Sequence, residues 1–123
     1  MPFNEPSLSL ADIRDAVAAI EQFTKDMDFD AFRKDPKTTA AVERKLLVIS
    51  EAAVRLGAQA DVLCPGLQWP NIRGIGNWLR HQYDRVDIET LWNTVTDDLP
   101  PLKVAVNRAL DPGPPASRGL DFG

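Results

Sequence analysis

The only histidine of the chain, His81, lies in a polar stretch, GNWLRHQYDRVD (residues 76–87). The pKa of a free imidazole is about 6.5, so a histidine can accept and donate protons near neutral pH. On a helix, residues that are three, four, seven or eight positions apart share a face. One polar stripe is therefore expected to gather guanidinium, amide, imidazole and carboxylate groups. Its members are Arg73, Asn77, Arg80, His81 and Asp84.

These groups suit the cleavage of a phosphodiester bond. The imidazole would move protons, a guanidinium would stabilise charge that develops on phosphate oxygens, and the amide of Asn77 would orient the ligand or the imidazole. With RNA as substrate, the 2′-hydroxyl is the nucleophile and no metal ion is required. A structural interpretation competes, because a lone helical histidine often packs, and charged residues on one helix often pair with one another. Spacing alone leaves both interpretations open.

The composition is that of one small domain. The chain has 123 residues, of which 44% are hydrophobic, enough for a core without cross-links. The single cysteine, Cys64, cannot form an internal disulfide and supplies no zinc cluster, so we expect neither a metal nor a cofactor. A net charge of −4 disfavours broad, charge-driven binding of nucleic acid but leaves room for a local basic patch.

The sequence shows no sign of membrane insertion or export. No apolar run approaches the roughly 20 residues that a bilayer-spanning helix needs. The N-terminus, MPFNEPSLSL, lacks the basic start and long apolar centre of a signal peptide. We therefore expect a protein of the reducing cytoplasm, without contact to a membrane.

Hydrophobic periodicity predicts helices along most of the chain. A Ser-x-x-Asp start at Ser9 opens a helix expected over residues 9–26, and Phe29 and Phe32 are expected to anchor a turn or short helical piece. A long helix should follow the Asp35-Pro36 start signal and end near Gly57. Within that helix, Glu51 and Arg55 are spaced as an ordinary ion pair.

The second half of the chain predicts three more helices. Residues 71–83 form one candidate, Asp87 can cap the next, and Asp98 can cap the last. Pro100 and Pro101 fit only the first turn of a helix, so they are expected to separate these last two helices.

The predicted fold is an all-α, antiparallel bundle of four to five helices. Convincing strand alternation is absent from the sequence, and short connections join the predicted helices. The helical domain is expected over residues 9–110, after a flexible arm at 1–8. A Pro/Gly-rich tail at 111–123 is expected to be disordered.

Three stretches together resemble one protein family. ISEAAVRL (49–56) resembles that family's helix I-G-E-A-A-x-R-L, LQWPNIRGIGNWLRHQYDRVD (67–87) resembles the segment that holds its site, and LWNTVTDDLPPLK (91–103) is similar to the helix pair that follows. The family is the HepT-like branch of the HEPN superfamily, small all-helical proteins of bacterial toxin–antitoxin systems. The resemblance covers about residues 10–110.

The resemblance implies a function and a set of site residues. The family's site is an Arg, four variable residues, His, one residue and Tyr; His81 and Tyr83 match its end. It implies a metal-independent endoribonuclease that acts as a homodimer, with the site in a cleft between two protomers. It also implies a minimal nucleotidyltransferase as antitoxin partner, which can silence the toxin by transferring AMP to Tyr83.

One position departs from the family's pattern. Gly76 stands where the motif has arginine, while the Asn that usually follows is present as Asn77. Two replacements are open: Arg80, about 100° from His81 around the helix, or Arg73, about 12 Å along its axis and able to serve the partner's site. Arg73 and Arg85 are predicted to bind substrate. The alternative function is a degenerate module that binds RNA, nucleotide or a nucleotidyltransferase without cleaving.

Overall fold

The structure of the protein, a computed structural model, describes residues 5–81 and 87–111. Helices make up most of both ranges, and neither range contains a strand. The prediction of an all-α helical bundle is therefore confirmed. The order along the chain is α1 (Glu5–Phe23), α2 (Phe29–Arg33), α3 (Pro36–Leu56), α4 (Gln59–Leu63), α5 (Trp69–His81), α6 (Ile88–Asn93), a π-helical turn η1 (Thr94–Asp98) and α7 (Leu99–Leu110).

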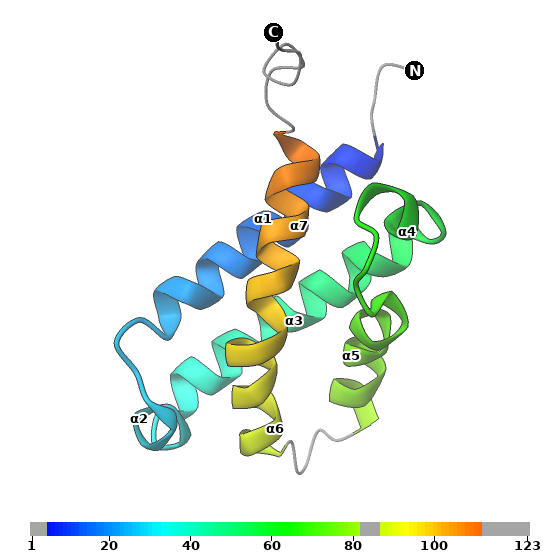
Figure 1. The fold of residues 1–123 in the computed structure, drawn as a ribbon. Helices are drawn as coiled ribbons and strands as arrows, with labels where there is room; N and C mark the ends of the chain where they lie inside the picture. The colour runs from blue at the N-terminus through cyan, green and yellow to red at the C-terminus, as the bar shows by residue number, and fades with distance from the viewer. Residues whose placement is uncertain (1–4, 82–86, 112–123) are drawn as a thin grey trace, which may run out of the picture.

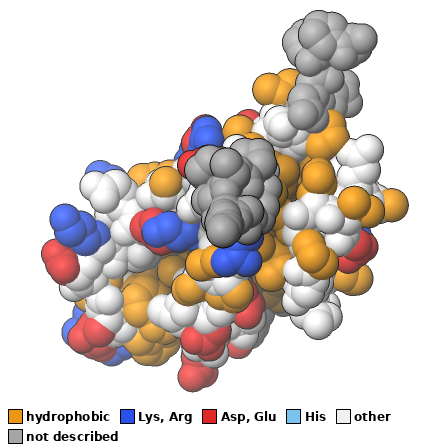
Figure 2. Space-filling view, turned by 45° about the horizontal axis from the view of Figure 1, so that its top comes forward, with side chains coloured by type: hydrophobic (Ala, Val, Ile, Leu, Met, Phe, Trp, Pro, Cys, Tyr) orange, Lys and Arg blue, Asp and Glu red, His pale blue; other side chains and the backbone are white. Residues whose placement is uncertain are grey.

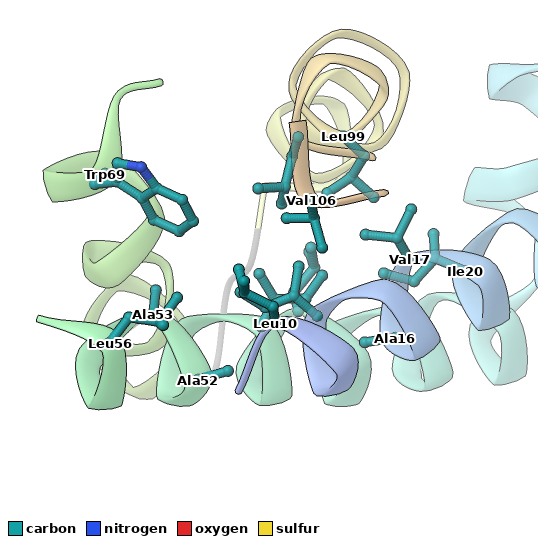
Figure 3. Packing of buried hydrophobic residues seen from close by; sticks show 14 of the residues in the cluster. Leu10, Ala16, Val17, Ile20, Ala52, Ala53, Leu56, Trp69, Leu99 and Val106 are labelled. Atoms are coloured by element: carbon teal, nitrogen blue, oxygen red, sulfur yellow. The ribbon is translucent and has the colours of Figure 1, made fainter. Parts of the chain in front are cut away.

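Two long helices form the centre of the bundle. In Figure 1, α1 and α3 lie side by side and run in opposite directions. Helix α7 packs on α1, and α5 packs on α3. The apolar faces of these four helices meet in one interior (Figure 3), where buried side chains exclude water. Residues that contribute to it include Leu10, Val17, Ile20, Ala53, Leu56, Trp69, Leu99 and Val106.

Helix starts lie where acidic caps predict them. The carboxylate of Asp35 accepts a hydrogen bond from the Thr38 backbone N–H at 3.0 Å, and Pro36 occupies the first turn of α3. Asp87 caps α6 in the same way by accepting from the Glu89 N–H at 3.0 Å. Helix α3 ends at Gly57, whose φ of 55° lies in the left-handed region that favours glycine. These three boundaries were correctly predicted.

The predicted start of the first helix is wrong. Helix α1 begins at Glu5 rather than at Ser9, so residues 5–8 of the expected arm are helical. Pro6 fits there because the first turn of a helix does not need its missing N–H. Ser9 does not cap; it is buried and accepts a hydrogen bond from Arg55 Nε at 3.4 Å. Burial of Ser9 and Leu10 against the neighbouring helix favours the longer α1.

The ion pair predicted within α3 is replaced by one between helices. Arg55 Nη2 lies 2.8 Å from Asp12 Oδ2 on α1, and no ion pair with Glu51 is among those of the described residues. The antiparallel packing of α1 on α3 places the Asp12 carboxylate within reach of this guanidinium. Both side chains are about half exposed, so this pair is expected to contribute no more than about 1 kcal/mol.

The last two predicted helices are joined rather than separated. Asp98 makes no side-chain cap, and the helical path continues from α6 through η1 into α7. The Leu99 N–H donates to the Thr94 carbonyl, five residues back, as in a π-helical turn. Pro100 and Pro101 cannot donate backbone hydrogen bonds, so the chain widens by one residue here instead of ending the helix. The sequence correctly predicted that Pro100 and Pro101 lie in the first turn of a helix, but the predicted break between this helix and the preceding one is wrong.

No helix within residues 5–81 and 87–111 is both long enough and apolar enough to cross a lipid bilayer. The tail predicted to be disordered, from residue 112 onward, lies outside the described residues, as do residues 1–4 of the predicted arm.

Candidate functional site

Helix α5 is anchored to the core at its first residue. Trp69 is fully buried, and its indole Nε1–H donates to the Cys64 carbonyl at 2.9 Å. Gly76 and Leu79 continue the buried face of the helix at the spacing of a helical stripe. Cys64 is buried as well, and burial raises the pKa of its thiol. The cysteine therefore has the character of a packing residue rather than of a nucleophile.

The predicted catalytic residues are exposed side chains near the C-terminal end of α5. Asn77, Arg80 and His81 are all exposed at the end of the helix that is farthest from Trp69. Asn77 precedes Arg80 by three positions and His81 by four, so the helix brings all three to one surface. None of their side chains makes a hydrogen bond or ion pair with another residue in 5–81 or 87–111. Within that part of the chain, these side chains therefore do not pair with one another or with neighbouring residues.

The remaining predicted site residues are placed differently. Arg73 is half-buried, and its Nη1 is buried without a hydrogen-bond partner among the described residues. It lies two turns before His81 and is not part of the exposed end of the helix. Tyr83, Asp84 and Arg85 lie outside the described residues, so their predicted roles stay predictions.

A buried serine joins α3 to the middle of α5. Ser50 is 2% exposed, and its hydroxyl donates to the Arg73 carbonyl at 2.7 Å. The same oxygen accepts a hydrogen bond from the Gly76 backbone N–H at 2.9 Å. The hydroxyl thus bridges two backbone groups one turn apart. It fixes how α5 is rotated against α3, and with it the direction in which Asn77, Arg80 and His81 point.

The Ser50 contact requires a glycine at position 76. A Cβ atom built on Gly76 would lie 2.8 Å from Ser50 Oγ and 3.3 Å from Leu47 Cδ1. The first distance is shorter than the ordinary contact distance of such atoms, about 3.5 Å. Position 76 therefore faces α3, whereas His81 lies on the exposed side of α5. At the position where the motif has arginine, this chain thus has a glycine that packs closely between α5 and α3.

Ser50 was missed as a site-related residue, although the sequence contained a signal. It stands at the second place of ISEAAVRL, where the resembled helix I-G-E-A-A-x-R-L has glycine. Gly76 stands where the resembled site has arginine. The two departures are 26 positions apart in the chain, and the structure brings them into direct contact. Neither position alone indicated the other.

Arg80 also borders a groove between α3 and α5. The groove has a volume of about 260 Å³ and is lined by Ala40, Glu43, Arg44, Leu47, Leu79 and Arg80. It adjoins the Ser50–Gly76 contact, because Leu47 takes part in both. Burial raises the pKa of the Glu43 carboxyl. The structure thus adds Glu43 and Arg44 to the surroundings of the predicted site, and no motif had singled them out.

No described group of residues has the composition of a metal site. Within the described ranges, no cluster of three or more His, Cys, Asp or Glu side chains is arranged to hold a metal ion. The chemistry available on α5 is that of imidazole, guanidinium and amide.

Comparisons with known proteins identify the family of the chain. A family described as "Ribonuclease HepT-like" matches residues 13–109. A protein of Thermococcus cleftensis named "Probable ribonuclease HepT" is 38% identical over 94 residues, which cover 76% of this chain and 86% of the relative. A protein of Methanocaldococcus jannaschii named "Putative RNase" is 35% identical over 100 residues, covering 81% of this chain and 83% of the relative. No match was found among solved structures.

Proposed function

Because the chain belongs to the ribonuclease HepT-like family, we propose that it is a metal-independent endoribonuclease with His81 as general acid and base. The observation that carries the proposal is the exposed group at the end of α5. There, His81, Asn77 and Arg80 share a surface, and their side chains make no hydrogen bond or ion pair among the described residues. Relatives with ribonuclease names align with most of this chain, which supports the same activity.

The proposed reaction uses the substrate's own nucleophile. The imidazole of His81 accepts the proton of the RNA 2′-hydroxyl as its oxygen attacks the adjacent phosphorus. The P–O bond to the 5′-oxygen breaks, and that oxygen takes up a proton as it leaves. Arg80 stabilises the charge on the phosphate oxygens, and Asn77 orients the phosphate or the imidazole. The products are a cyclic phosphate end and a 5′-hydroxyl end.

A homodimer would complete this site. Two proton transfers occur in the reaction, and the chain contains a single histidine. A two-fold symmetric dimer that places two copies of α5 near its axis would supply a second His81 and a second Arg80. It would also concentrate positive charge locally on an acidic protein. On the face seen in Figure 2, basic side chains lie among acidic ones, so this face offers no broad basic surface to RNA.

The test is cleavage of RNA by the purified protein and by its His81→Ala variant, each with and without a metal chelator. We expect cleavage by the wild type in both conditions and none by the variant. Equal rates for the two proteins would remove His81 from the mechanism. Loss of wild-type activity with the chelator would contradict the metal-independent route.

A second function, RNA binding without cleavage, is favoured by one observation. Position 76, where the resembled site has arginine, packs against Ser50 and carries no charge. A module of this kind would bind RNA, a nucleotide or a nucleotidyltransferase partner. RNA affinity without product under any condition would favour it, whereas cleavage that is lost in His81→Ala would end it.

The proposed regulation involves a minimal nucleotidyltransferase as antitoxin. In this scheme the partner transfers AMP to the hydroxyl of Tyr83, two residues after His81, and the bulky nucleotide blocks the site. Incubation of both proteins with ATP should add the mass of one AMP group to this chain, as measured by intact-mass spectrometry. Addition that persists in Tyr83→Phe would exclude this tyrosine as the acceptor.

A further inference from the structure

The groove between α3 and α5 has a basic side chain on each of its two helices. Arg44 comes from α3, and Arg80 comes from α5, directly before His81. Leu47 and Leu79 also line the groove, one from each helix. Both arginines are exposed, so their charged ends are accessible to a ligand.

Both guanidinium groups are available for a ligand. The three arginines that have an ion pair among the described residues lie outside the groove: Arg14 pairs with Asp15, Arg33 with Asp30, and Arg55 with Asp12. Arg44 and Arg80 have no acidic partner within residues 5–81 and 87–111. A guanidinium matches the geometry of phosphate oxygens and remains charged at all relevant pH values.

Glu43 also lines the groove, and its carboxyl group is the acidic group among the lining residues. It forms no described ion pair with either of them, and the rise in its pKa comes from burial. Its carboxylate would repel an anion in the groove. Removal of the Glu43 charge should therefore strengthen anion binding, whereas removal of an arginine should weaken it.

The close contact at Gly76 shapes the groove. Residue 76 has no side chain, and Leu47, which lines the groove, lies only 3.3 Å from where a Cβ atom of residue 76 would be. Apolar side chains next to a guanidinium lower the local dielectric constant and so strengthen its attraction for an anion. The contact that excludes an arginine at position 76 thus adjoins a groove that presents two others.

We propose that Arg44 and Arg80 form a phosphate-binding groove that holds the backbone of an RNA strand next to His81. In this arrangement Arg44, from α3, supplies a positive charge that position 76 lacks. The proposal rests on the proposed ribonuclease function for the identity of the ligand, and it assigns a role to a helix outside the resembled site motif.

The experiment measures binding separately from cleavage. A fluorescently labelled 2′-O-methyl RNA oligonucleotide has no free 2′-hydroxyl, so the proposed reaction cannot cleave it. We expect Arg44→Gln to weaken its binding by about two- to fivefold, the effect of one exposed ion pair. We also expect the slope of log K against log salt to fall by about 0.7, the contribution of one phosphate contact on a single strand.

Two further variants complete the design. Arg108→Gln is the matched control, because Arg108 is an exposed arginine on α7 that lines a different groove and has no described ion pair. It should leave affinity and salt slope unchanged. Glu43→Gln removes the repulsive charge and should tighten binding by about two- to threefold. Thermal unfolding of each variant checks that the fold is intact.

The outcomes separate this proposal from the proposed function. Equal affinity of the Arg44→Gln and Arg108→Gln proteins would overturn the groove, as would weaker binding by Glu43→Gln or no RNA binding by the wild type. Cleavage of ordinary RNA is assayed in parallel. Arg44-dependent binding without wild-type cleavage would support the groove and contradict the ribonuclease. Cleavage of RNA by the wild type, together with binding that does not change in Arg44→Gln, would support the ribonuclease and contradict the groove.

Discussion

Substitution of Gly76 by alanine tests whether the α3–α5 contact controls the placement of the site. In an unconstrained helix, glycine to alanine stabilises by about 1 kcal/mol, because alanine loses less backbone entropy. At position 76 the added Cβ would lie 2.8 Å from Ser50 Oγ. That oxygen belongs to a short, buried side chain held by two hydrogen bonds, so it cannot move aside as a flexible side chain would.

The expected magnitude follows from these opposing effects. Overpacking of a buried contact typically costs about 1–3 kcal/mol, and displacement of the hydroxyl would break hydrogen bonds that contribute about 1 kcal/mol each. Set against the gain of about 1 kcal/mol from helix propensity, these costs leave a net loss of about 1–4 kcal/mol in the free energy of unfolding. Gly76→Ala is thus expected to destabilise the protein despite its better helix propensity.

Two comparisons make the measurement specific. Gly74 lies in the same helix, and a Cβ there would meet nothing within 4 Å, so Gly74→Ala should stabilise by about 1 kcal/mol. In a Ser50→Gly background the oxygen is gone, and Gly76→Ala should become neutral or stabilising. The double-mutant cycle should then show a coupling energy of at least about 1 kcal/mol between positions 50 and 76.

The assay is urea denaturation followed by far-UV circular dichroism, at one protein concentration so that any self-association stays constant. Equal stabilisation by Gly76→Ala and Gly74→Ala would refute the reasoning, because it would mean that the Ser50 contact tolerates a side chain. A penalty that persists in the Ser50→Gly background would show that another neighbour, such as Leu47, is responsible.

Three further substitutions test the fold. Hydrogen bonds from Thr38 hold the pKa of the Asp35 carboxyl below its usual value. The ionised carboxylate therefore stabilises the folded protein at pH values above its unfolded pKa of about 3.9. This stabilisation is lost as the pH falls through the lower pKa of the folded state. Asp35→Ala should therefore lower the thermal midpoint at about pH 7, with the difference shrinking at about pH 3. Trp69→Phe leaves the Cys64 carbonyl without its indole donor and should cost about 2–3 kcal/mol in urea denaturation. Arg55→Gln removes a half-exposed ion pair and should cost no more than about 1 kcal/mol; a larger loss would mark the pair as structural.

Local sequence features predicted the helices well. The Asp35-Pro36 start, the Gly57 end and the Asp87 cap are properties of neighbouring residues, and all three are confirmed. The start of α1 and the junction before α7 were wrong for a shared reason. In each case the helix continues through a residue that was expected to mark its boundary. Packing against α3 outweighed the Ser9 signal, and a wider helical turn bridged the junction before Pro100 and Pro101.

The site residues were predictable only in part. His81, Asn77 and Arg80 follow from helical spacing and from the family pattern, and the structure places them on one exposed helix end. The surroundings did not follow, because they belong to α3. Neither Arg44 in the groove nor Ser50 beneath Gly76 is near His81 in the sequence.

By itself, the sequence determined the helical class, the boundaries at Asp35, Gly57 and Asp87, the family resemblance and the identity of the groups on α5. These depend on short-range periodicity, capping and motif spacing, which act within a few residues. The tertiary structure alone decided that Arg55 pairs with Asp12, that Gly76 lies against Ser50, and that Arg44 borders one groove with Arg80. Each of these contacts joins residues 26 to 43 positions apart. Their distances depend on how two helices are rotated and offset against each other, and buried packing sets that geometry rather than the pattern within either helix.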